Sequence, residues 1–123
     1  MIEYKVRVYA DGAKHWFLNN QRHREDGPAI ERANGGKSWY LNGKRHREDG
    51  PAIEGADGSK SWYLNGELHR EDGPAVEWAS GTKHWHLNGE KISEQEFIAQ
   101  SIKEMTLSQV IEELGYDIKI IKE

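Results

Sequence analysis

A unit of 23 residues recurs through most of this chain and limits the folds open to it. Trp16, Trp39, Trp62 and Trp85 lie 23 residues apart, and almost every neighbouring residue keeps the same spacing. Chains of this kind stack small units, so each unit buries a face against its neighbours and not against a central core. Such stacking suits a chain of 123 residues that is only 36% hydrophobic and 31% charged.

Each unit has the pattern of a β-hairpin. In the second unit, Trp39 and Leu41 are two residues apart, so both point to the same face of a strand. The Asn42-Gly43 pair that follows favours a type I′ turn, because both residues accept a positive φ. The spacing predicts that the Trp and Leu side chains form the buried seam between units. Further turns are expected at Asp11-Gly12, Gly35-Gly36, Asp57-Gly58 and Ser80-Gly81.

The pattern resembles the MORN repeat, a 23-residue β-hairpin unit that stacks into a long twisted sheet. The resemblance rests on Trp39, on Asn42-Gly43-Lys44-Arg45-His46 and on Ala56-Asp57-Gly58-Ser59-Lys60. After the histidine, where MORN units usually have Gly-x-Gly, this chain has Arg47-Glu48-Asp49-Gly50-Pro51. That variant looks like repeats of small phage and prophage proteins. The resemblance implies a scaffold, a dimerisation surface or a lipid contact, and no particular activity.

The two ends of the chain depart from the repeat. Residues Ile2 to Tyr9 alternate in polarity, which predicts a half-buried strand. Ser93 and Glu96 form a capping-box pattern for a helix. A second helix from Leu107 to Leu114 and a strand from Tyr116 to Ile121 are predicted after it. The expected fold is therefore mainly β, an elongated antiparallel sheet over residues 1–92 with a small helical cap and terminal strand over residues 93–123.

Composition excludes several classes of function. The chain has no cysteine and no apolar run of the roughly 20 residues that a membrane span needs. Its first residues lack the pattern of a secretory signal, so we expect a cytoplasmic protein, in the host cytoplasm if a phage encodes it. Residues 1–92 carry 14 basic and 14 acidic residues, so the net charge of −4 belongs to the tail. A balanced repeat predicts no direct binding to nucleic acid or to a membrane.

The His-Arg-Glu-Asp segments are the main candidates for chemistry. His23, His46 and His69 are each separated by two strands, about 9.5 Å, so they are not expected to share a metal ion. The acidic pairs beside them recur unchanged, which indicates turn chemistry and not one catalytic pocket. No nucleophile motif and no cofactor signature is present. We therefore predict a protein that is not an enzyme and that holds neither a metal nor a cofactor.

Two sets of residues are candidates for binding. The first is a row of side chains next to the tryptophans, which either forms an exposed contact strip or packs under the C-terminal helices: Phe17, Tyr40, Tyr63 and His86. Acidic residues of the tail extend this predicted protein interface: Glu94, Glu112, Glu113 and Asp117. The alternative set would bind an anion: Arg24, Arg47, Arg70, His23, His46 and His69.

The functional hypothesis is binding without catalysis. A protein partner is expected, and the phage-like repeat suggests a small accessory protein that inhibits a host protein such as a CRISPR nuclease. The alternative hypothesis is capture of a small anionic ligand, such as a nucleotide, by the Arg and His residues between repeats or subunits. The terminal strands could also pair between two copies and form a homodimer.

Overall fold

The computed structural model describes residues 3–104 of the chain. The chain divides into two units, Met1–Ser93 and Glu94–Glu123, which are described separately. The predicted second helix, Leu107 to Leu114, and the predicted last strand, Tyr116 to Ile121, lie outside the described residues.

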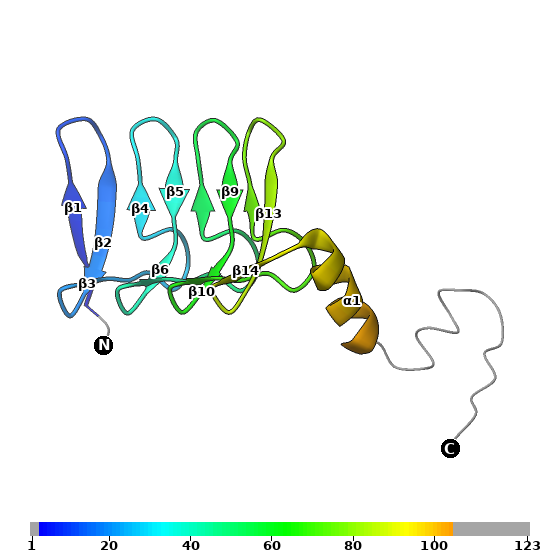
Figure 1. Ribbon diagram of the computed structural model, residues 1–123. Helices are drawn as coiled ribbons and strands as arrows, with labels where there is room; N and C mark the ends of the chain where they lie inside the picture. Colours follow the sequence, from blue (N-terminus) through cyan, green and yellow to red (C-terminus); the bar gives the residue numbers. More distant parts are fainter. Residues whose placement is uncertain (1–2, 105–123) are drawn as a thin grey trace, which may run out of the picture. The chain divides into compact units, whose positions relative to one another are not determined.

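Four upper hairpins stand in one row in the first unit, with all their turns at the same end (Figure 1). Neighbouring hairpins pair edge to edge, so the whole row is one antiparallel sheet in which each strand lies beside the next strand of the row. The strand predicted from Ile2 to Tyr9 is observed as β1, with shorter bounds. The strands of the upper hairpins are β1 (Lys5–Val8), β2 (Lys14–Leu18), β4 (Ile30–Glu31), β5 (Lys37–Ser38), β8 (Ile53–Glu54), β9 (Lys60–Ser61), β12 (Val76–Glu77) and β13 (Lys83–Leu87).

Short lower hairpins lie along the opposite side of the row from the upper turns (Figure 1). They are formed by the ends of β2 and β13 with β3 (Gln21–Arg22) and β14 (Glu90–Ile92), and by the pairs β6 (Tyr40–Leu41) with β7 (Lys44–Arg45) and β10 (Tyr63–Leu64) with β11 (Glu67–Leu68). Adjacent lower hairpins are joined by backbone hydrogen bonds such as that from Gly43 N–H to the Arg22 carbonyl (2.9 Å). Each unit therefore contributes to two hairpins, where the sequence predicted one.

The turns follow the local sequence. Asn42 and Gly43 have φ values of 51° and 81°, which confirms the type I′ turn predicted for the Asn-Gly pair. At the upper turns the left-handed residue is a glycine, and in the second unit it is Gly35, with φ of 93°. The predicted turn at Gly35-Gly36 was therefore one residue too late. The preceding Asn34 explains the position, because its side chain accepts a hydrogen bond from Gly36 N–H (2.9 Å).

The chain passes from an upper to a lower hairpin at each tryptophan. Trp39 lies between β5 and β6; its N–H donates to the Ala52 carbonyl (2.7 Å) and its carbonyl accepts from His46 N–H (3.1 Å). Trp62 makes the equivalent bonds to Ala75 and His69 (2.8 and 3.0 Å). The backbone of the tryptophan thus joins its own unit to the Gly-Pro-Ala segment that follows.

Burial is deepest beside the tryptophans and not at them. Ala29, Ala52 and Ala75, the alanines that follow Gly-Pro, are completely buried. Trp39 and Leu41 are only half-buried, so the prediction that they form the buried seam overstated how far these side chains are buried. A second buried strip crosses the upper sheet in register, from Ile30 and Ser38 to Val76.

The second unit begins with α1 (Glu94–Glu104). It starts directly after Ser93, with Glu94 and Glu96 in its first turn, where carboxylates favour the positive end of the helix dipole. Within residues 3–104 the fold is mainly β, an open arrangement of antiparallel hairpins followed by one helix.

Candidate binding surface

The repeated arginine of each unit stacks on the repeated tryptophan. The guanidinium carbon of Arg47 lies 3.8 Å from the centre of the Trp39 ring, and the equivalent distances for Arg24 and Arg70 are 4.0 and 3.8 Å. A cation over an indole face at this distance is a favourable contact. This surface of the sheet, which carries Trp16, Trp39, Trp62 and Trp85, is called the tryptophan face.

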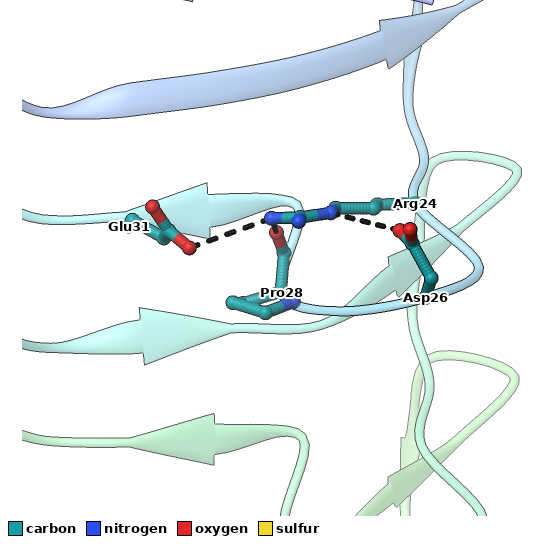
Figure 2. A network of polar contacts seen from close by, with 4 residues as sticks. All are labelled: Arg24, Asp26, Pro28 and Glu31. Atoms are coloured by element: carbon teal, nitrogen blue, oxygen red, sulfur yellow. Dashed lines mark hydrogen bonds and ion pairs between the residues drawn. The ribbon is translucent and has the colours of Figure 1, made fainter.

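Each of these guanidinium groups is also held by its own loop. Figure 2 shows the Arg24 side chain extended between the carboxylates of Asp26 and Glu31, with the Pro28 carbonyl beside it. Its Nε donates to Asp26 (3.0 Å), and one Nη donates to the Pro28 carbonyl (3.2 Å) and to Glu31 (3.4 Å). Arg47 makes the same three contacts one repeat later. The repeated arginines are therefore structural groups whose charge is already compensated.

The repeated histidines link one unit to the next. The Nδ1 atoms of His23, His46 and His69 accept hydrogen bonds from the backbone N–H groups of Asn42, Asn65 and Asn88, at 2.8 to 2.9 Å. Their Nε2 atoms lie 3.4 to 3.5 Å from the glutamate two residues later. Because Nδ1 is an acceptor, each ring carries its proton on Nε2. Each histidine therefore contacts both the acid of its own loop and the backbone of the next unit.

Two equivalent grooves lie between consecutive His-Arg-Glu-Asp segments, with volumes of about 690 and 640 Å³. The first is lined by Trp39 and Leu41 and by exposed carboxylates, including Glu25 and Asp26. An anion entering it would meet carboxylates and two arginines, Arg24 and Arg47, that already have carboxylate partners. This geometry does not favour the predicted anion site at Arg24, Arg47, Arg70, His23, His46 and His69.

The opposite surface, called the tyrosine face, carries the other predicted row: Phe17, Tyr40, Tyr63 and His86. All four side chains are half-buried. The Arg45 guanidinium lies 5.8 Å from the Tyr40 ring centre and 5.6 Å from that of Tyr63, so one arginine sits between two tyrosines. Arg22 lies 5.7 Å from the Phe17 ring. From Phe17 to Tyr63 the row therefore alternates aromatic rings and guanidinium groups, and Leu68 takes the next equivalent position.

His86 ends this row with an unusual environment. Its Nδ1 atom is buried and has no hydrogen-bond partner among the described residues. Partial burial lowers the pKa of His86, and the neighbouring His84 and Lys91 add to this effect, whereas the backbone of Gly89 opposes it. His86 therefore favours the neutral form.

The two faces differ in charge, which the overall composition conceals. Every carboxylate within a strand of the sheet lies on the tryptophan face: Glu31, Glu54, Glu67, Glu77 and Glu90. The charged strand residues of the tyrosine face are all basic: Lys5, Arg7, Arg22, Arg45 and Lys91. A charge count over the whole repeat region does not separate the faces, and Arg22 and Arg45 were not among the predicted site residues. The signal was present, because Arg22, Arg45 and Lys91 each follow an aromatic residue of the row by five positions.

The predicted acidic extension of the interface is only partly described. Glu94 is exposed at the start of α1, in the second unit. Glu112, Glu113 and Asp117 lie outside the described residues. Within residues 3–104, no three His, Asp or Glu side chains come together in a way that could hold a metal ion.

Searches of protein-family models, of curated proteins and of solved structures found no match to this chain. The resemblance to MORN repeats therefore stays a prediction from the sequence. No helix within residues 3–104 is long and apolar enough to cross a membrane.

Proposed function

We propose that this protein is a binding module without catalytic activity, and that it contacts a partner protein through the tyrosine face. The observation that supports the proposal most is the alternation of Tyr40, Arg45 and Tyr63 on a half-buried row of the sheet. Tyrosine and arginine are among the residues that contribute most to protein interfaces. The contacts of Arg45 with both rings restrict these side chains before binding, which lowers the entropy lost on association.

The charge of the tyrosine face defines the partner further. Since its charged strand residues are all basic, the complementary surface of the partner is acidic. The phage-like form of the repeat leads us to propose a host protein as this partner, with inhibition of a defence protein such as a CRISPR nuclease as the effect. A surface of that nuclease rich in Asp and Glu, and not its basic nucleic-acid channel, would be the point of contact.

The experiment is capture of partners from a bacterial lysate by tagged protein, with a double variant of the row. Tyr40→Ala with Tyr63→Ala removes the rings and leaves the backbone hydrogen bonds of both hairpins unchanged. A stoichiometric partner that is held by the native protein and lost by this variant supports the proposal. The matched control is Lys37→Ala with Lys60→Ala on the tryptophan face, which should retain the partner. Equal capture by all three proteins would exclude the tyrosine face.

The inhibitory role has its own test. Cells that carry an active CRISPR nuclease and express the native protein should become permissive to a targeted phage, and cells that express the tyrosine double variant should not. Full restriction in both strains, with the protein folded and abundant, would reject inhibition of that nuclease. It would leave the binding proposal to the capture experiment.

A further inference from the structure

The arginines at the N-terminal end of the sheet differ from the repeated arginines in their partners. Arg24, Arg47 and Arg70 each contact two carboxylates. Arg7, Arg22 and Arg32 form no ion pair with any residue in the described part of the chain. Their contacts are with neutral groups: the rings of Tyr9 and Phe17, the imidazole of His15 and the hydroxyl of Ser38.

These three arginines surround one imidazole. Arg22 Nε lies 3.4 Å from His15 Nδ1, and Arg7 is the cross-strand neighbour of His15. The Tyr9 ring lies 4.8 Å from the imidazole, at an angle of 58°. Partial burial lowers the pKa of His15, and the positive charges of Arg22, Arg32 and Arg7 lower it further, against the opposing effect of Asp11. The electrostatic environment is therefore positive despite an acidic chain.

An open hollow of about 740 Å³ lies beside this cluster, between the turns of the first two upper hairpins. Tyr9, His15 and Arg32 line it, together with the turn residues around Asp11 and Asn34. The carboxylate of Asp11 is engaged by Ala13 N–H (2.9 Å), and the Asn34 side chain by Gly36 N–H. Its volume falls within the range of sites that hold small organic ligands.

Two arginines and one histidine, in the lining of this hollow or beside it, depart from the repeat. Arg7 occupies the position of Ile30, Ile53 and Val76 in the other units, and Arg32 that of Gly55 and Trp78. His15 stands where the next two units have Ser38 and Ser61. The fourth unit also has a histidine, His84, at the position of His15, but a structural role common to all units would not need the two arginines, because the other hairpins fold without them.

We propose that this hollow binds a small phosphorylated ligand, whose phosphate groups are held by Arg7, Arg22 and Arg32 and whose attached ring lies against Tyr9 and His15. Planar guanidinium groups donate paired hydrogen bonds to phosphate oxygens, and uncompensated ones do so without first breaking an ion pair. The site is distinct from the repeated Arg-Trp pairs; it shares Arg7 and Arg22 with the tyrosine face but uses neither Tyr40 nor Tyr63.

The experiment is calorimetric titration of the full chain with ATP, tripolyphosphate and adenosine, using variants that restore the repeat. Arg7→Ile and Arg32→Gly introduce residues that other units carry at these positions, so the fold should persist, as circular dichroism would check. We expect ATP to bind more tightly than tripolyphosphate, and adenosine not to bind. Each variant should weaken ATP binding about tenfold, because one charge-assisted contact is lost.

Arg45→Leu is the matched control, since Leu68 occupies the equivalent position and the change in charge is the same. It should bind ATP as the native chain does. The site is overturned if ATP does not bind, or if Arg45→Leu weakens binding as much as Arg32→Gly does. Equal affinity for ATP and tripolyphosphate would show that the rings of Tyr9 and His15 do not contribute to binding. Much tighter binding of a single-stranded oligonucleotide would contradict the small ligand and indicate that the site binds nucleic acid. None of these outcomes bears on capture of a partner through Tyr40 and Tyr63.

Discussion

The guanidinium group of Arg47 lies over the Trp39 ring, its carbon 3.8 Å from the ring centre, while the same group donates a hydrogen bond to the Pro51 carbonyl (3.0 Å). One side chain thus fixes both the indole and the loop that returns the chain to the next upper hairpin. Gly50 allows this, because a Cβ at that position would lie 3.0 Å from the guanidinium carbon. The conserved spacing of Trp, Arg and Gly-Pro within the chain reflects this contact.

Replacing Arg47 should therefore destabilise the sheet. Arg47→Ala removes the stacking contact and leaves the Pro51 carbonyl without its donor, and we expect a loss of about 1–3 kcal/mol in the free energy of unfolding. The exposed ion pair with Asp49 adds little to this value. Urea unfolding measures the change. Arg22→Ala is the control. Arg22 has no carboxylate partner among the described residues, so its removal should lower the free energy of unfolding by no more than about 0.5 kcal/mol. Equal losses for the two variants would contradict a structural role for the stack.

Ala52 is the point at which the sheet tolerates the least change in volume. It is completely buried, and its carbonyl accepts the Trp39 N–H. Ala52→Leu should lower the free energy of unfolding by about 1–3 kcal/mol, because the added methyl groups force neighbouring atoms apart. Ala56→Leu, in the exposed upper turn of the same unit, should leave the urea midpoint almost unchanged. A tolerant Ala52 would mean that the units pack less tightly than this burial indicates.

The repeat, the type I′ turns and the open antiparallel fold could be predicted because they depend on local signals. Asn42-Gly43 needs only its own backbone preferences to turn, and the period of 23 residues needs no structure at all. The degree to which the Trp39 side chain is buried could not be predicted. Alternation tells which face a side chain takes, but only the path of the Gly-Pro-Ala loop determines that Arg47 covers the ring and that Ala52 becomes the buried residue.

The candidate surfaces were predicted less well, for a physical reason. A count of charges over residues 1–92 gives balance, whereas strand alternation separates the signs onto two faces. Arg45 and Tyr40 share a face because they are cross-strand partners, and this could have been read from the turn between them. The hollow beside His15 could not be predicted from the sequence, because two hairpins that lie side by side in the sheet form it.

The environment of His15 predicts how stability depends on pH. Its pKa in the folded chain lies below the ordinary value of 6.5, because of partial burial and of the charges of Arg22, Arg32 and Arg7, with Asp11 in opposition. Between the two pKa values the unfolded chain binds more protons, so the free energy of unfolding falls as the pH drops through about 6.5. His15→Ser should flatten this dependence in urea unfolding at about pH 5 and about pH 7.5. Some slope should remain, because the pKa of His86 is lowered as well. An unchanged profile would contradict the assigned environment.

The outer edge of β1 allows a test of self-association. Tyr9 N–H donates to the Ala13 carbonyl, so by alternation the backbone groups of Val6 and Val8 point away from β2. Within the described residues no strand pairs with this side of β1. Both valine side chains are also well exposed, at 47% and 63%. The predicted homodimer through a terminal strand would therefore form by pairing of two chains along this edge of β1.

Antiparallel pairing of two β1 strands through this edge brings like charges together in the registers with the longest overlap. With Val6 opposite Val6 of the second copy, Lys5 faces Arg7; a shift in one direction places Arg7 opposite Arg7, and a shift in the other places Lys5 opposite Lys5. The native chain should therefore not dimerise through this edge. Lys5→Glu converts both contacts of the first register into opposite-charge pairs, so this variant should show a concentration-dependent dimer in sedimentation equilibrium, weakened by salt. Adding Val6→Pro removes an outward N–H without breaking a bond to β2, and it should return the variant to a monomer. A native dimer that survives Val6→Pro would place the contact between copies on another surface.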